Sequence, residues 1–161
     1  MDALEELKPV MATIQATYPE AGKGNIGVGS TIFAVKPGDG SAREQAASCQ
    51  KVLGGWANIA NEYATKRYRS NLINWGMLPL LNDQLTMGKS QGTVGVSVEV
   101  GDMIILPGVR KAVETAAKEI CGYIWKKDGS LTPVTFTTGD LTDDERKIIL
   151  AGSLVGYYKE G

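Results

Sequence analysis

The 161 residues predict a single domain of the α/β class. A β-branched apolar run at 30–35 is followed by glycines and then by a helical pattern at 46–53, which is the order strand, turn, helix. A second strand pattern follows at 56–60, and a hairpin signal leads to a further strand within 126–137. Strands that alternate with helices are typical of α/β domains.

The first helix is predicted over residues 2–17. Its apolar residues are spaced by three or four, as on one face of a helix: Leu4, Leu7, Val10, Met11 and Ile14. Pro9 interrupts this pattern, so we expect a kink or two short helices. Residues 18–22 contain a proline and a glycine and form a helix stop signal.

Residues 22–27 match the pattern G-x-G-x-x-G literally. A dinucleotide fingerprint must follow a strand and begin a helix, whereas this match follows a helical pattern and leads into the strand at 30–35. In a chain with 20 glycines, a match out of context does not indicate a dinucleotide site.

The most informative stretch is 38–45, between the first strand and its helix. The run at 30–35 has the composition of a buried strand. Ser41 falls where an N-cap belongs, and Glu44 three residues later completes the spacing of a capping box. The simplest interpretation is therefore an ordinary helix start.

The same stretch also has the features of an anion site. Its glycines allow a ligand to approach the backbone, and the N–H groups at the start of the helix favour a negative charge. Arg43 lies in the first helical turn, where acidic residues are preferred. A bound carboxylate or phosphate would explain a cation at this position.

The middle of the chain is predicted as a strand at 56–60 followed by a polar helix at 61–69. The basic residues of this helix are expected on its solvent side, as a solvated face or as a docking surface for another domain: Lys66, Arg67 and Arg69. Ser70 and Asn71 are placed to cap the next helix.

Residues 84–106 predict loop and strand. The glycine-rich part, 84–97, is expected as a loop with an edge strand. Residues 96–100 alternate like a half-buried strand, and 103–106 are fully apolar. A turn follows at Pro107 and Gly108.

The C-terminal part combines a hairpin with a final helix. Residues 109–120 predict a helix or the approach to the hairpin, whose turn is marked by Asp128-Gly129. A strand follows at 134–137. Thr142 and Glu145 have the spacing of a capping box and begin the last helix, which is expected to end at or soon after Gly152.

Composition excludes several function classes. The net charge is −1, which argues against nucleic acid or an anionic membrane as a partner, and no apolar run approaches the ~20 residues of a spanning helix. The acidic N-terminus lacks the features of a signal peptide, so we expect a cytoplasmic protein. There is no histidine, which excludes histidine-dependent triads and most zinc sites.

The two cysteines are far apart in the sequence and lack a second ligand nearby. Cys49 is expected in the core or a groove, and Cys121 is expected to be buried, since free cysteine often behaves as a small hydrophobic residue. An iron–sulfur cluster usually needs three or four cysteines, so this chain is not expected to hold one or any other metal by itself.

Four motifs occur in an order that resembles the aconitase superfamily. They are Gly38-Asp39-Gly40-Ser41-Ala42-Arg43-Glu44-Gln45, Leu53-Gly54-Gly55, Arg69-Ser70-Asn71-Leu72 and Gly76-Met77-Leu78-Pro79-Leu80. The resemblance is to the C-terminal swivel domain of aconitase-type hydratases, which also serves as the small subunit of isopropylmalate dehydratases. It extends over about 30–161 and implies one three-layer β/β/α domain over 1–161 with a mixed, barrel-like sheet, 1–29 being a helix and glycine-rich lead-in.

The resemblance implies part of a hydro-lyase that removes and re-adds water on a hydroxy di- or tricarboxylic acid. Ser41 matches the serine that takes the proton α to a carboxylate, and Arg43 matches the arginine that binds a substrate carboxylate. Gly40 and Ala42 are the flanking substrate-binding positions. A 4Fe–4S cluster, acting as Lewis acid on the hydroxyl, is implied in partner domains or a large subunit, so the isolated chain is expected to be inactive.

This sequence departs from the family pattern in three places. Ala42 replaces a second serine, Gln45 replaces a histidine, and no arginine precedes Arg43, although the family has one upstream of this strand. A smaller or differently held substrate is therefore expected. The alternatives are a non-catalytic carboxylate- or anion-binding module on the same fold, and a structural protein in which Ser41 and Glu44 only cap a helix.

Overall fold

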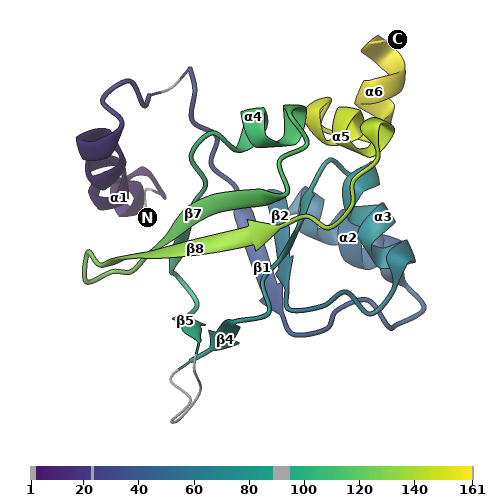
Figure 1. Cartoon of the computed structure of the whole chain (residues 1–161), viewed down its shortest axis with the longest axis horizontal. Coiled ribbons are helices and arrows are strands. Elements are labelled where there is room, and N and C mark those ends of the chain that lie inside the picture. The colour runs from purple at the N-terminus through teal and green to yellow at the C-terminus, as the bar shows by residue number, and fades with distance from the viewer. Residues whose placement is uncertain (1–2, 23, 89–94, 161) are drawn as a thin grey trace.

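The computed structural model describes residues 3–22, 24–88 and 95–160. A six-stranded mixed sheet forms its centre, in the order β1-β2-β3-β8-β7-β6 (Figure 1). The strands of one half are parallel, and those of the other half are antiparallel. Their bounds are β1 Ser30–Ala34, β2 Gly55–Ala60, β3 Leu78–Leu81, β6 Met103–Ile105, β7 Glu119–Trp125 and β8 Leu131–Thr137.

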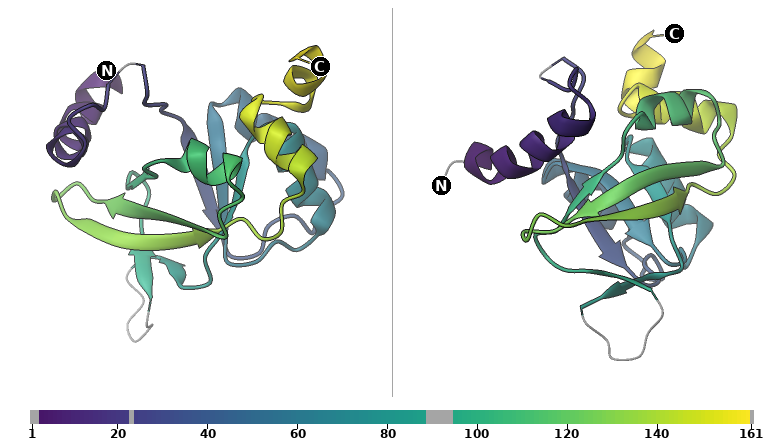
Figure 2. Two further views of the ribbon diagram at one scale, coloured as in Figure 1. Left: turned by 45° about the horizontal axis from the view of Figure 1, so that its top comes forward. Right: turned by 60° about the vertical axis from the view of Figure 1, so that its left-hand side comes forward.

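Three layers result from the connections between these strands. Helices α2 (Arg43–Val52) and α3 (Lys66–Asn74) are the crossovers that the parallel strands require, and they pack against each other on one face of the sheet. A separate parallel pair, β4 (Leu85–Met87) and β5 (Val96–Val98), lies across the other face. The main sheet curls into a half-barrel (Figure 2). The three-layer β/β/α arrangement with a mixed, curled sheet is thus confirmed.

The apolar core lies on both faces of the sheet. One cluster fills the concave side, between the main sheet and the β4–β5 pair: Ile59, Leu80, Leu85, Val98, Ile120, Ile124, Val134 and Phe136. A second, smaller cluster lies beneath α2 and α3: Ala47, Tyr68, Leu72 and Met77. Strands buried on both faces, such as β2 and β3, therefore have nearly continuous apolar sequences.

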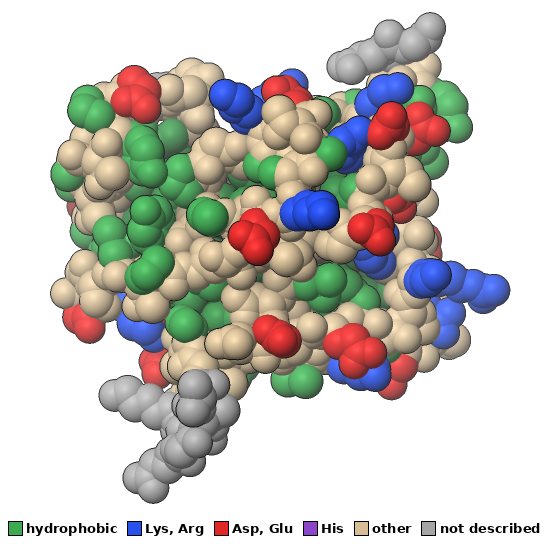
Figure 3. All heavy atoms as spheres, in the orientation of Figure 1, with side chains coloured by type: hydrophobic (Ala, Val, Ile, Leu, Met, Phe, Trp, Pro, Cys, Tyr) green, Lys and Arg blue, Asp and Glu red, His purple; other side chains and the backbone are tan. Residues whose placement is uncertain are grey.

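The N-terminal helix α1 (Ala3–Thr17) continues through Pro9 as one element, rather than as two short helices. It ends at the predicted stop signal, because Tyr18 is the last residue whose N–H bonds back to the helix, at Ile14. The helix lies at the opposite end of the molecule from α5 and α6 (Figures 1 and 2). On that side of the surface, hydrophobic side chains gather, whereas elsewhere acidic and basic side chains are interspersed (Figure 3).

Three helices cover the C-terminal half: α4 (Val109–Glu114), α5 (Asp143–Leu150) and α6 (Leu154–Glu160). The predicted box at the start of α5 is confirmed, because Thr142 Oγ1 accepts from Glu145 N at 3.2 Å while Glu145 Oε2 accepts from Thr142 N at 2.9 Å. The Asp128-Gly129 hairpin between β7 and β8 is confirmed as well. No sequence pattern predicted α6, which follows a turn at Gly152.

The predictions for 84–106 are partly confirmed. Strands β4 and β5 lie within the region expected as loop and edge strand, and residues 89–94 lie outside the described part. The strand predicted at 96–100 ends at Val98, and Val100 is 94% exposed. The apolar run at 103–106 forms β6, whose residues are half-buried. Residues 109–120 contain both alternatives, the helix α4 and the start of β7.

Strand β1 is not the buried strand that its composition predicts. It forms one edge of the sheet, where none of the described strands covers its outer side, and Ile32 is 45% exposed. Both cysteines are exposed, so the prediction of a buried Cys121 is wrong, and Cys49 does not lie in the core. Cys121 lies on β7 between the buried residues Ile120 and Gly122, and the alternation of the strand turns it to the outer face.

The polar helix predicted at 61–69 begins only at Lys66, because Thr65 is its N-cap. Ser70 and Asn71 therefore lie inside α3 and do not cap a helix. Lys66 and Arg67 are exposed, as expected, but the Arg69 side chain is only 19% exposed and belongs to a network that links α3 to the β8–α5 connection. Of the described helices, none is both long and apolar enough to cross a membrane.

Candidate functional site

The site predicted from the sequence lies at the carboxyl ends of β1, β2 and β3 (Figure 1). These strands are parallel and adjacent, so the segments that leave them meet at one edge of the sheet. The segment after β1 carries Ser41, and the segment after β2 runs beside it. Backbone hydrogen bonds join the two segments, from Glu62 N to Val35 O at 3.0 Å and from Ala64 N to Pro37 O at 2.9 Å.

Helix α2 begins one residue later than the capping-box prediction requires. Its N-cap is Ala42, whose carbonyl accepts the first helical bond from Ala46 N at 3.0 Å, and no side chain caps the helix. The carboxylate of Glu44 instead accepts from Trp75 Nε1 at 3.2 Å, at the end of α3. The prediction of an ordinary Ser41–Glu44 cap is therefore wrong.

Ser41 is exposed on the turn before α2. Within the described ranges, its hydroxyl makes no hydrogen bond, in contrast to Thr142, whose hydroxyl caps α5. The N–H groups of the first helical turn follow directly, without intrahelical acceptors. The helix dipole adds a partial positive charge at this end, so the turn presents a hydroxyl and several donors together.

Arg43 folds back over the turn that carries Ser41. Its Nε donates to Gly38 O at 3.1 Å, and Nη2 donates to Asp39 O at 3.4 Å. These bonds use two of the five N–H groups of a guanidinium, and the others remain to bind an anion. The backbone around Gly40 is open, since a Cβ there would meet no atom within 4 Å. All four predicted site residues, 40–43, thus lie on one short turn.

A hollow of about 280 Å³ opens at the ends of β2 and β3, and none of the predicted site residues 40–43 lines it. It is lined by Asn61, Glu62, Tyr63, Thr65, Lys66, Arg69 and Leu81. Tyr63 donates to Asn58 O at 2.8 Å and to Leu80 O at 3.2 Å. Burial raises the pKa of the Tyr63 hydroxyl above its usual range; nearby Tyr68 adds to the rise, and Arg69 opposes it.

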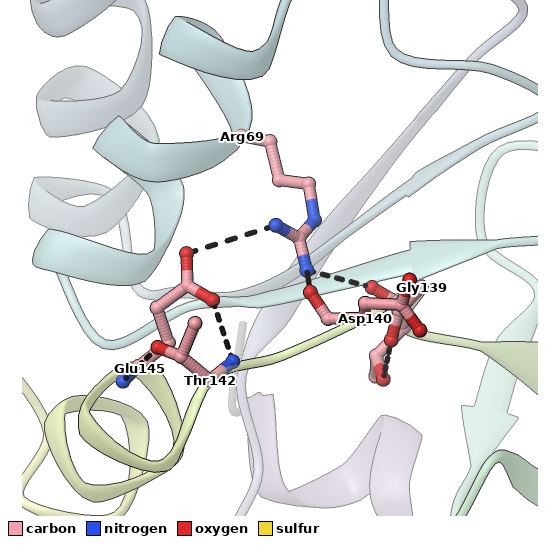
Figure 4. A network of polar contacts seen from close by, with 6 residues as sticks. Arg69, Gly139, Asp140, Thr142 and Glu145 are labelled. Atoms are coloured by element: carbon pink, nitrogen blue, oxygen red, sulfur yellow. Dashed lines mark hydrogen bonds and ion pairs between the residues drawn. The ribbon is translucent and has the colours of Figure 1, made fainter.

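Arg69 connects this hollow to the C-terminal half of the chain (Figure 4). Its Nη2 donates to Thr138 O at 3.0 Å and to Asp140 O at 2.9 Å, whereas Nη1 lies 3.7 Å from Glu145 Oε1. No local sequence pattern indicates this role of Arg69, because its partners are distant along the chain. The larger hollow, of about 320 Å³, lies elsewhere, between β1, β6 and the β4–β5 pair, and contains none of the predicted site residues.

In the described part of the chain, no three cysteine, aspartate or glutamate side chains are placed so that they could hold a metal ion together. Cys49 lies on α2 and Cys121 on β7, so the two thiols belong to different elements. The residues of this chain therefore do not fit an iron–sulfur cluster.

Two comparisons with known proteins support the fold. The aconitase C-terminal domain family matches residues 28–85, which include the whole Ser41 turn and the first three strands. Aconitate hydratase A from Rickettsia bellii (strain RML369-C) is 28% identical over 135 residues, which cover 83% of this chain. The chain spans only 14% of the length of that relative. The matched family, the similarity to this relative and the mixed, curled sheet together support an aconitase-superfamily swivel domain.

Proposed function

We propose that residues 1–161 form one swivel domain that acts as part of an aconitase-like hydro-lyase, as a domain of a longer chain or as a small subunit. The observation that carries the proposal is the turn at 40–43, which combines an exposed serine, an arginine and a helix N-terminus within the matched segment. Because the chain spans 14% of its relative, the remaining machinery must come from other domains. A cytoplasmic location is part of the proposal, because the acidic N-terminus lacks the basic and apolar regions of a signal peptide.

In this proposal, Ser41 is the base that takes a proton from the carbon α to a substrate carboxylate. A serine is a weak base at its ordinary pKa, so the alkoxide needs stabilisation from its surroundings. The first-turn N–H groups, the helix dipole and the nearby guanidinium of Arg43 are of the right sign to provide it. A 4Fe–4S cluster is expected in the partner domains, and the contribution of this chain is confined to proton transfer and carboxylate binding.

Arg43 would bind the substrate carboxylate, with the backbone N–H groups of Gly40 and Ala42 beside it. A guanidinium can grip a carboxylate through two parallel hydrogen bonds, which orients the carbon acid toward Ser41. Ala42 offers no hydroxyl where the resemblance leads one to expect a serine. The substrate is therefore expected to be a hydroxy di- or tricarboxylic acid with fewer contacts to this turn.

The test is turnover of the enzyme assembled with its cluster-bearing partner. We expect Ser41→Ala to lower kcat by about three orders of magnitude, as for the loss of a general base, while substrate still binds. Ser48→Ala is the matched control, because Ser48 lies on the same helix and, among the residues that the structure describes, its hydroxyl bonds to Gln45 O alone, at 3.2 Å. Near-normal turnover of Ser41→Ala would refute the assignment of the base.

A second candidate is a carboxylate-binding module without catalysis, which the missing hydroxyl at Ala42 favours. Hydratase activity on addition of a cluster-bearing partner separates the two, because a module would bind citrate and succinate in calorimetric titration and yet give no activity. The mass of the endogenous protein is a simpler first measurement. A mass well above the 17.2 kDa of these residues indicates a single-chain hydratase, and a mass of 17.2 kDa indicates a small subunit.

A further inference from the structure

One backbone carbonyl, that of Gly38, is shared between the Ser41 turn and α3. It accepts from Arg43 Nε at 3.1 Å and from Thr65 Oγ1 at 2.9 Å. Thr65 is also the N-cap of α3, and its Oγ1 accepts from Tyr68 N at 3.2 Å. A single hydroxyl therefore connects the start of α3 to the group that holds Arg43.

The side chain of Tyr68 packs against the backbone at Gly38. Gly38 has a φ of +99°, and a Cβ on it would lie 2.5 Å from Cβ of Tyr68, so the backbone passes directly against this side chain. Tyr68 is 2% exposed, and its hydroxyl accepts from Gln50 Nε2 at 2.7 Å and from Asn58 Nδ2 at 3.2 Å. Gln50 lies on α2, the helix that Arg43 begins, so the contacts form a closed ring.

The ring fixes the direction in which the Gly38 carbonyl points. A peptide that follows a glycine rotates easily unless hydrogen bonds or packing hold it. If Thr65 Oγ1 were removed, the carbonyl of Gly38 would keep only the hydrogen bond from Arg43 and could rotate. The guanidinium that is bonded to this carbonyl would then lose its fixed position. Small errors in the placement of a binding group weaken substrate binding strongly.

We infer that Thr65 is a positioning residue for Arg43, acting through the carbonyl of Gly38, with Tyr68 as its support. The inference rests on the proposed function, in which Arg43 binds the substrate carboxylate. According to this inference, the hydroxyl of Thr65 at the start of α3 determines the affinity for substrate, although it donates its hydrogen bond to the backbone carbonyl of Gly38.

The test compares Thr65→Val, Thr65→Gly and Thr65→Ser in the assembled enzyme. Thr65→Val and Thr65→Gly remove the hydroxyl and are expected to raise KM about tenfold, with kcat changed less than about threefold. Thr65→Ser keeps the hydroxyl and is expected to restore the wild-type KM. Glycine is a tolerated N-cap, so Thr65→Gly keeps the test valid if the valine variant fails to fold.

Thr142→Val is the control for loss of a helix cap, because Thr142 caps α5 and does not contact the turn. It should lower stability and leave KM unchanged. A wild-type KM for both Thr65→Val and Thr65→Gly, or an equal rise for Thr142→Val, would overturn the inference. If the assembled wild-type protein has no hydratase activity, the proposed hydratase function fails. The affinity of each variant for citrate then replaces KM as the quantity compared. Absence of citrate binding by the wild type would overturn the inference as well.

Discussion

Nη2 of Arg69 donates a hydrogen bond to the backbone carbonyl of Asp140 at 2.9 Å, across 71 residues of sequence. The same nitrogen donates to Thr138 O, so the guanidinium ties α3 to the connection between β8 and α5 (Figure 4). The carboxylate of Glu145 is 3.7 Å from Nη1, beyond hydrogen-bond range, so the two carbonyls carry most of the interaction.

Replacement of Arg69 by alanine should lower the free energy of unfolding by about 2–4 kcal/mol, because two carbonyls lose a charged donor in a mostly buried setting. Urea denaturation measures this. Arg110→Ala is the control, since the Arg110 side chain is 74% exposed and pairs with Glu114 one turn away; we expect a loss below about 0.5 kcal/mol. Equal losses in the two variants would show that Arg69 does not link the two halves.

The two predicted capping boxes should respond differently to alanine. Thr142→Ala removes an observed cap and should cost about 1 kcal/mol of stability. Ser41→Ala removes a hydroxyl that caps nothing and should cost less than about 0.5 kcal/mol. Thermal and urea unfolding of both variants check this, and a loss of about 1 kcal/mol for Ser41→Ala would restore the cap interpretation.

Two glycines of the same turn form a matched pair. Gly38→Ala should destabilise the protein by about 2 kcal/mol or more, because φ is +99° and the added Cβ would lie 2.5 Å from Tyr68. At Gly40 an added Cβ meets nothing within 4 Å, so Gly40→Ala should leave stability within about 0.5 kcal/mol of wild type. Similar stabilities for both variants would contradict the packing of Gly38 against Tyr68.

Tyr63 should make stability fall at high pH. Burial raises the pKa of its hydroxyl in the folded state above the unfolded value of 10.0, so the folded state keeps a proton that the unfolded state loses. This contribution is fully present below pH 10 and is lost as pH rises toward the folded pKa, with a slope of about −1.4 kcal/mol per pH unit.

Tyr63→Phe tests this prediction. The variant should be less stable than wild type at pH 8 by about 1–3 kcal/mol, since the carbonyls of Asn58 and Leu80 lose their donor. Above pH 10 the gap should shrink as the wild type loses its Tyr63 contribution. The measurement is urea unfolding at several pH values between 8 and 11, and a constant difference across that range would contradict a raised pKa.

Local features were predictable wherever the hydrogen bonds or the periodicity lie within a few residues. The Thr142–Glu145 box, the Asp128-Gly129 hairpin and the end of the first helix at Thr17 are of this kind. Ser41 and Glu44 have the same spacing as Thr142 and Glu145 but form no box. The carboxylate of Glu44 instead accepts a hydrogen bond from Trp75, the C-cap of α3. This partner lies 31 residues away along the chain, so no local sequence rule predicts the interaction.

The sequence by itself determined the α/β class, the first two strands with the helix between them, the β7–β8 hairpin and the turn that carries Ser41 and Arg43, because periodicity, glycines and short motifs act over a few residues. The tertiary structure alone decided that β1 is an exposed edge, that both cysteines face outward, and that Arg69 and Thr65 point to backbone carbonyls. These three features depend on which distant segments of the chain pack together. A strand of the same composition is buried or exposed according to its neighbours in the sheet.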